Sequence, residues 1–270
     1  MFETYLLRWN LVPDGDQIAI PAARLLPVLH GDQPAVLKLS HEEDERRGGT
    51  LMQWWDGQGS ARVFARDDTA LLLERATGSA SLANMARDGR DDDACRILCA
   101  TAAKLHAPRS KPFPELIPLA HWFRELEPAA AKYGGILLRC AESARRLLAE
   151  PGECGVLHGD IHHDNVLDFG ARGWLAIDPK GLLGERGFDF ANIFTNPDLA
   201  DPTRPVATEP DCFERRLEVV TQVAKLERQR LLCWILAWTG LSAAWSLGDN
   251  DPSATIALRI AELAAAELDR

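Results

Sequence analysis

The spacing of apolar residues changes near Gly78, and this change constrains the fold more than any other feature of the chain. Before Gly78, short apolar runs are separated by Asp-Gly and Gly-Asp pairs, which favour tight turns. Such runs predict an antiparallel sheet, and they occupy residues 18–20, 25–29, 35–39, 61–65 and 70–73. A charged segment over residues 41–47 leads into residues 51–55 and predicts one helix that ends before Asp56.

Beyond Gly78 the apolar residues recur at helical spacing. Helices are predicted over residues 94–106, 118–132, 135–148, 217–245 and 254–268. Between them, residues 165–178 contain two short apolar runs around a Gly-Ala-Arg-Gly turn, which predicts a β-hairpin. A chain of 270 residues is long enough for two unequal lobes. We therefore expect an α+β fold, with a small antiparallel-sheet lobe over residues 1–77 and a larger, mostly helical lobe over residues 78–270.

A polar segment in the second lobe, residues 158–165, has the sequence His-Gly-Asp-Ile-His-His-Asp-Asn and is followed by Asp178. Phosphoryl transfer needs a carboxylate that orients the acceptor hydroxyl, oxygen ligands for Mg²⁺ and a cation beside the phosphates. The expected hairpin folds the chain back, so Asp178 can lie close to Asn165. This arrangement predicts Asp160 as the catalytic base, with Asn165 and Asp178 as metal ligands.

Asp168 begins an Asp-Phe-Gly triplet, the sequence that binds metal in protein kinases. It follows Asn165 by three positions along the expected strand, and an odd offset places two side chains on opposite faces. Asp168 also directly precedes the hairpin turn. We therefore assign the metal to Asp178 and interpret Asp168 as a solvated turn residue.

Lys38 in the first lobe is the candidate cation for the phosphates. It stands among apolar residues on an expected strand, where an unpaired charge is costly to bury, so it should face an anionic group. A carboxylate from the following helix should pair with it, and we choose Glu45 over Glu42 and Glu43. Taken alone, Lys38 could instead be an edge-strand lysine that faces water.

Two other interpretations of residues 158–165 stay open. One is a transition-metal site, as in metallohydrolases, because imidazoles and carboxylates lie close together in the sequence. Its ligands would come from His158, His162, His163, Asp160 and Asp164. That interpretation gives no role to Asn165, the hairpin or Asp178. In the other, these residues only satisfy a polar loop, although so many ionisable groups are unusual for a turn.

Composition limits the partners of the chain. The formal net charge is −10, which argues against a nucleic-acid-binding face and is compatible with a cationic ligand. No apolar run reaches the roughly 20 residues of a membrane span, and residues 1–10 do not resemble a secretory signal. The six cysteines form no C-x-x-C pair, which suits free thiols in a reducing compartment. We expect a cytoplasmic protein without a nucleic-acid or membrane partner.

The segments around these residues resemble the aminoglycoside phosphotransferase superfamily, and within it the streptomycin 6-kinase and hydroxyurea phosphotransferase branch. The likeness covers nearly the whole chain and is strongest over residues 156–165, 174–181 and 187–192. The Ile-Asp-Pro-Lys-Gly run at residues 177–181 is the most particular to this branch. The resemblance implies a protein-kinase-like bilobal fold, ATP and Mg²⁺ as cofactors, and phosphorylation of an alcohol group on a small molecule.

The resemblance also implies roles for individual residues. It gives Asp160 the role of catalytic base, Asn165 and Asp178 that of Mg²⁺ ligands, and Lys38 the contact with the α- and β-phosphates. Residues 73–76, with Glu74 and Ala76, would form a hinge that holds adenine through backbone groups. Asp189 would be a buried support that hydrogen-bonds the catalytic loop.

The acceptor implied by the resemblance is a small cationic molecule, which carboxylates and flat aromatic faces would bind. Candidate contacts are Glu185, Asp189, Trp234 and Asp249. Trp234, Trp238 and Trp245 also recur at offsets of four and seven, the spacing of a core-facing stripe, so a core position is favoured for most of them.

The function expected from these observations is that of an ATP-dependent kinase that modifies aminoglycosides and resembles streptomycin 6-phosphotransferases. Antibiotic resistance would follow from such an activity. The alternatives are a kinase of hydroxyurea or of an unrelated metabolite, a weakly active regulatory member that binds nucleotides, and, more remotely, a metallohydrolase.

Overall fold

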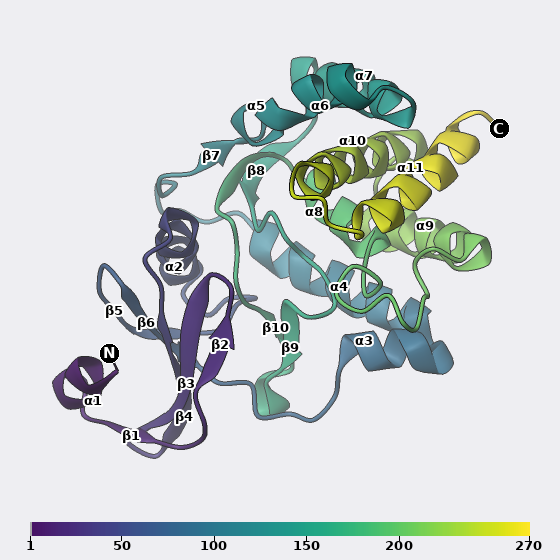
Figure 1. The fold of residues 1–270 in the computed structure, drawn as a ribbon. Coiled ribbons are helices and arrows are strands. Elements are labelled where there is room, and N and C mark those ends of the chain that lie inside the picture. Colours follow the sequence, from purple (N-terminus) through teal and green to yellow (C-terminus); the bar gives the residue numbers. More distant parts are fainter. Residues whose placement is uncertain (1) are drawn as a thin grey trace.

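The computed structural model describes residues 2–270 and has an antiparallel sheet beside a larger body of helices (Figure 1). The sheet region contains α1 (Glu3–Arg8), β1 (Leu11–Pro13), β2 (Ile18–Ile20), β3 (Ala23–His30), β4 (Gln33–Leu39), α2 (Glu43–Trp55), β5 (Val63–Arg66) and β6 (Ala70–Glu74). The helical region contains α3 (Leu82–Met85), α4 (Asp91–His106), β7 (Ile117–Pro118), α5 (Leu119–Trp122), α6 (Leu126–Tyr133), α7 (Ile136–Ala149), β8 (Cys154–Leu157), β9 (Val166–Asp168), β10 (Trp174–Ala176), β11 (Leu182–Glu185), α8 (Gly187–Ala191), α9 (Pro210–Ala224), α10 (Arg228–Gly248) and α11 (Ala254–Leu268).

The first sheet has the strand order β1-β3-β4-β6-β5, with β2 also paired to β3, and every pairing is antiparallel. Side chains alternate between its two faces. One face carries Val28, Leu37 and Leu72, which form a small core with Phe2 near the N-terminal end of α1. The opposite face carries Lys38 and is directed toward the helical region, so the sheet presents this lysine to the second lobe.

Helix α2 follows the sheet in sequence but packs into the larger core. It ends at Trp55, and the left-handed backbone of Asp56 (φ 55°) stops the helix where the sequence predicted. Its residues Leu51, Met52 and Trp55 are buried in the main hydrophobic cluster. Near the middle of α2, a Cβ built on Gly48 would lie 2.4 Å from the carbonyl oxygen of Pro179. The helix therefore touches the segment that follows Asp178, and only glycine leaves room for that contact.

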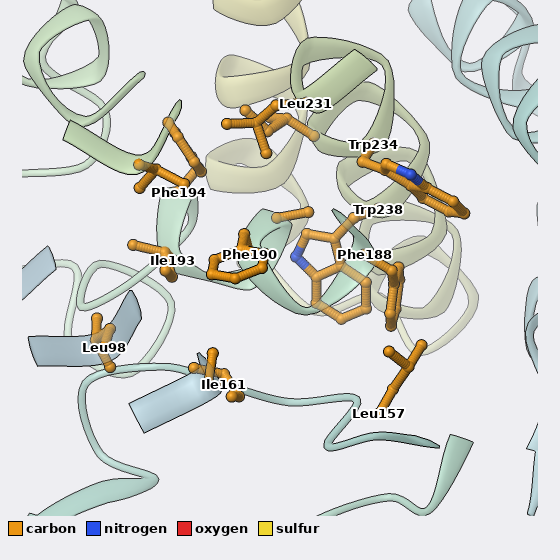
Figure 2. Packing of buried hydrophobic residues seen from close by; sticks show 14 of the residues in the cluster. Leu98, Leu157, Ile161, Phe188, Phe190, Ile193, Phe194, Leu231, Trp234 and Trp238 are labelled. Atoms are coloured by element: carbon orange, nitrogen blue, oxygen red, sulfur yellow. The ribbon is translucent and has the colours of Figure 1, made fainter. Parts of the chain in front are cut away.

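The core of the helical region lies around α8 and α10. Phe188 packs edge-on against Trp234 and Trp238, with ring centroids 5.7 and 5.8 Å away. Figure 2 shows Leu157 and Ile161, which flank residues 158–160, on the side of this cluster opposite Trp234. Residues 158–160 are thus anchored by apolar side chains at both ends.

Three sequence predictions need correction. Residues 217–245 form two helices rather than one, because Lys225 adopts a left-handed conformation (φ 53°) between α9 and α10. A second sheet, β7-β11-β8, was not predicted, since its strands are short and two of them are separated by the hairpin segment. Helix α10 is long and apolar enough for a membrane span, although the sequence indicated no such run, but 72% of its apolar window is buried in the protein.

The hairpin predicted over residues 165–178 is present as β9 and β10, with Leu167 opposite Leu175. It returns the chain so that Ile177 donates its backbone N–H to the carbonyl oxygen of Asn165 at 2.9 Å. Residues 75–81 connect the sheet to α3 and run past this hairpin, where Gly78 donates to the carbonyl oxygen of Asp168 at 2.9 Å. The hairpin therefore brings Asn165 next to the residue that precedes Asp178, and it lies beside the connector between the two regions.

Candidate active site

One buried carboxylate fixes the start of the loop formed by residues 158–165. Asp189, on α8, is fully buried and accepts hydrogen bonds from the backbone N–H groups of His158 at 2.9 Å and Gly159 at 2.7 Å. The Nε2 atom of His106, on α4, lies 2.7 Å from the same carboxylate. Burial alone would raise the pKa of Asp189, but the hydrogen bond and charge of His106 with the other contacts outweigh it and lower the pKa. Asp189 is therefore an ionised support beneath the loop.

His158 joins this loop to the segment that carries Asp178. Its Nε2 atom lies 2.8 Å from the carbonyl oxygen of Ile177, and its own carbonyl oxygen accepts from the backbone N–H of Lys180 at 2.7 Å. The imidazole is fully buried and stacks on Trp55 at a centroid distance of 6.0 Å. Burial lowers the pKa of His158, so the neutral ring serves as a structural link.

The side chain of Asn165 is hydrogen-bonded to Asp160 across the loop formed by residues 158–165. The amide Nδ2 of Asn165 donates to the carbonyl oxygen of Asp160 at 3.0 Å and to its Oδ2 at 3.2 Å. His162 approaches the other carboxylate oxygen, with Nε2 3.8 Å from Oδ1. The Asp160 side chain is 25% exposed, so an acceptor hydroxyl can reach it from solvent.

Five side chains of alternating charge from the two regions form a series of ion pairs, which we call the charge chain. Lys38 pairs with Glu45 on α2 and with Asp178, whose Oδ1 lies 2.5 Å from the ammonium nitrogen. Lys180 continues the series, with Nζ 3.4 Å from Asp178 Oδ2 and 3.7 Å from Asp160 Oδ2. The structure thus brings together four predicted residues from both lobes, and it adds Lys180, which the sequence analysis did not assign to the site.

Asp178 has the features of a metal ligand. Burial alone would raise its pKa, but the charges of Lys38 and Lys180 lower the pKa to about 2, so the carboxylate is ionised at neutral pH. Its backbone φ of 60° is uncommon for a residue with a side chain, and such conformations cluster at functional sites. Both side-chain hydrogen bonds of Asn165 use its nitrogen, which turns the amide oxygen away from Asp160. One carboxylate and one amide oxygen suit Mg²⁺, which keeps several waters and takes its other ligands from phosphates.

The predicted hinge lies where the pairing of β6 with β4 ends. The backbone N–H of Glu74 donates to Arg62, and that of Arg75 donates to Pro34, before Ala76 begins the connector. The Glu74 carboxylate is held by an ion pair with Arg172, so any contact of Glu74 with adenine would use its backbone.

An apolar surface that was not predicted from the sequence surrounds Lys38 on the sheet. Ile18, Leu25, Val36 and Leu73 share the sheet face that carries Lys38, according to the strand register. Ile18 is 50% exposed, which is unusual for a large apolar side chain in a sheet. The strand pattern contained this signal, because Val36 precedes Lys38 by two positions.

The residues predicted to contact the acceptor occupy different environments. Glu185 is buried and binds Arg230, the indole N–H of Trp234 at 2.9 Å and the backbone N–H of Gly152 at 2.8 Å. Trp234 is 1% exposed and belongs to the core described above. Asp249 is exposed at the C-terminal end of α10. Glu185 and Trp234 therefore have structural roles, as does Asp189, and we do not retain these three as acceptor contacts.

Asp168 is not merely a solvated turn residue. Its carboxylate accepts from the backbone N–H groups of Gly170 at 2.9 Å and Ala80 at 3.3 Å. It therefore ties the hairpin to the connector between the two regions.

The histidines do not converge on a common point. Within residues 2–270, no three His, Cys, Asp or Glu side chains form a group that could hold a metal ion. His163 is 2% exposed, neither ring nitrogen has a hydrogen-bond partner, and burial lowers its pKa well below the ordinary value. The transition-metal interpretation gains no support from this arrangement.

Comparisons with known proteins identify the family of the chain. A family model described as aminoglycoside/hydroxyurea antibiotic resistance kinase matches residues 8–250. A streptomycin 3''-kinase from Klebsiella pneumoniae is 58% identical over 243 residues, which are 90% of this chain and 91% of that protein. A streptomycin 6-kinase from Streptomyces griseus is 31% identical over 90% of this chain and 81% of its own length.

Solved structures support the predicted fold at low sequence identity. An aminoglycoside phosphotransferase in a ternary complex with ADP and hygromycin B superimposes with a TM-score of 0.70, 13% identity and 97% coverage of both chains. An ethanolamine kinase from Plasmodium vivax gives a TM-score of 0.63 and 10% identity over 93% of this chain and 81% of that one. The protein-kinase-like architecture is therefore confirmed.

Proposed function

Because this chain belongs to the aminoglycoside/hydroxyurea antibiotic resistance kinase family, we propose that it transfers the γ-phosphate of ATP to the 3''-hydroxyl of streptomycin. The observation that carries the proposal is the 58% identity to a streptomycin 3''-kinase over nine-tenths of both chains. The streptomycin 6-kinases are 31% and 32% identical, which favours the 3'' position over the 6 position expected from the sequence.

Asp160 acts as the catalytic base. Its carboxylate is partly exposed and is oriented by Asn165, so it can hold the acceptor hydroxyl and take its proton. Lys38, fixed by Glu45, neutralises the α- and β-phosphates. In these roles Asp160 and Lys38 position the acceptor and the nucleotide. Such positioning is most of what phosphoryl transfer requires of a protein.

Asn165 and Asp178 would hold Mg²⁺ through their side-chain oxygens. When bound, the ion neutralises charge on the phosphate oxygens of ATP. The lowered pKa of Asp178 and its contacts with the two lysines support this role. Residues 73–76 would hold adenine through backbone groups, beside the apolar sheet face that carries Val36.

The acceptor is a small cationic molecule, and the acidic net charge of −10 favours its approach. Burial of most of α10 supports a soluble enzyme, and we place it in the cytoplasm, where ATP is available. Phosphorylation of streptomycin there would make the enzyme a resistance factor. We propose no nucleic-acid or membrane partner.

The test is ADP release with Mg²⁺-ATP and a panel of streptomycin, hydroxyurea and other aminoglycosides. We expect release that depends on streptomycin, and a product that carries phosphate on the 3'' oxygen by NMR. Asp160→Asn is the control and should lose most turnover while it still binds nucleotide. Phosphate at the 6 position would overturn the assigned hydroxyl, and turnover of hydroxyurea alone would overturn the assigned acceptor.

A further inference from the structure

We propose that Lys180 is a catalytic residue that contacts the transferring γ-phosphoryl group, separately from the contact of Lys38 with the α- and β-phosphates. This inference rests on the proposed kinase function. Lys180 belongs to the charge chain, but it is neither the proposed catalytic base, nor a metal ligand, nor the lysine that contacts the α- and β-phosphates. The inference gives it a role.

The position of the ammonium group carries the proposal. Lys180 Nζ lies between two carboxylates, 3.7 Å from Asp160 Oδ2 and 3.4 Å from Asp178 Oδ2. The acceptor oxygen must bind next to Asp160, and the metal-bound phosphates must bind next to Asp178. The phosphoryl group crosses from the second carboxylate toward the first, so a cation that contacts both lies beside its path.

The backbone holds Lys180 in place. Its N–H donates to the carbonyl oxygen of His158 at 2.7 Å, which ties it to the catalytic loop. Gly159 has φ 86°, and a Cβ built there would lie 2.8 Å from Leu182 Cδ1 and 3.1 Å from Lys180 Cβ. The missing side chain at Gly159 therefore leaves room for Leu182 and for the lysine stem beside the loop, and the preorganised cation needs little rearrangement during the reaction.

The two lysines differ in their surroundings. The Lys38 side chain is 10% exposed and is held from behind by Glu45, whereas that of Lys180 is 27% exposed and contacts the catalytic base. Lys38 therefore belongs to the inner part of the site and Lys180 to the part that faces the acceptor. A lysine donates as a compact charge with rotatable hydrogens, which suits a phosphoryl group that moves.

In the proposed step, the bond between the γ-phosphorus and the β,γ-bridging oxygen breaks while the acceptor oxygen forms its bond to phosphorus. The bridging oxygen keeps the electron pair and leaves with ADP, and the acceptor proton moves to Asp160. Lys180 stays protonated throughout and donates hydrogen bonds to the equatorial oxygens, where negative charge is spread in the transition state.

The first experiment measures binding and needs no acceptor. Dissociation constants of the Mg²⁺ complexes of ADP and of AMP-PNP, which carries a γ-phosphate analogue, are measured by calorimetry for the wild type, Lys180→Met, Lys180→Arg and Lys38→Met. We expect Lys180→Met to weaken AMP-PNP binding about 10-fold and leave ADP binding nearly unchanged, as for loss of one charged hydrogen bond. Lys38→Met should weaken both nucleotides.

The second experiment measures turnover of the acceptor that the wild type accepts. We expect kcat to fall about 100- to 1,000-fold in Lys180→Met, with KM for the acceptor nearly unchanged and partial recovery in Lys180→Arg. Equal losses for ADP and AMP-PNP, or no loss for either, would overturn the assignment. If the wild type turned over no acceptor, the proposed function would fail, while the difference between the two nucleotides would still test Lys180.

Discussion

Gly48 provides a sharp test of how α2 is coupled to the catalytic centre. The helix carries Glu45, which fixes Lys38, and it meets the segment after Asp178 at the carbonyl oxygen of Pro179. A Cβ on Gly48 would lie 2.4 Å from that oxygen, whereas ordinary contact begins near 3.4 Å. Gly48→Ala must therefore move the helix and the segment apart by about 1 Å, because the obstacle is backbone and cannot rotate away.

The neighbouring Gly49 supplies a matched control. A Cβ there would lie 3.3 Å from Cδ1 of Leu71, a flexible side chain that can yield. Each Gly→Ala change in a helix gains about 1 kcal/mol from propensity. At Gly49 most of this gain should appear as stability, while at Gly48 an overpacking cost of about 1–3 kcal/mol offsets it.

Activity should separate the two variants more clearly than stability does. A 1 Å displacement of catalytic groups costs about 100-fold in rate, so Gly48→Ala should lose about 10- to 100-fold in kcat. Gly49→Ala should keep the wild-type rate. The measurements are acceptor-dependent ADP release and thermal unfolding of both variants. Wild-type turnover by Gly48→Ala, or an equal loss in Gly49→Ala, would refute the coupling.

Two further predictions concern aspartates and a buried imidazole. Asp178→Ala should abolish Mg²⁺-dependent nucleotide binding, as measured by calorimetry. Asp168→Ala should preserve nucleotide binding but lower the free energy of urea unfolding by about 1 kcal/mol, because it removes hydrogen bonds to backbone N–H groups. The reverse pattern of nucleotide binding would show that the metal aspartate is misassigned. His163 has a folded-state pKa well below its ordinary 6.5, so the unfolded chain binds more protons and stability falls as pH drops below 6.5. Between pH 6.5 and 5, the wild type should lose about 2 kcal/mol more than His163→Leu in urea unfolding, and parallel curves would contradict this.

The residues of the charge chain show what a sequence can predict. Asp160 and Asn165 lie five positions apart in one loop, and the hairpin that returns Asp178 to them has a clear turn signal. Lys38 could be paired with the helix that follows it because strand and helix are adjacent in the chain. These relations are local or nearly so, and the contacts between Lys38, Glu45 and Asp178 agree with them.

The contacts of Glu185 and Lys180 could not be predicted from the sequence, because they depend on parts of the chain that only the fold brings together. Glu185 ends a strand of the unpredicted second sheet, and its partner Arg230 comes 45 positions later on a helix whose start was misplaced. Lys180 stands in the Ile-Asp-Pro-Lys-Gly run that carries the family resemblance, but that run does not indicate where the lysine side chain points. That direction depends on the left-handed backbone of Asp178 and the gap at Gly159, which are properties of the folded chain.

The packing of α2 has a consequence for the charge chain. Leu51, Met52 and Trp55 root this helix in the same core as the catalytic loop, so the ion pair of Lys38 with Glu45 is built as the chain folds. A change in the apolar packing beneath α2 would therefore disturb the Lys38–Glu45 pair, and with it the charge chain, without altering any charged residue.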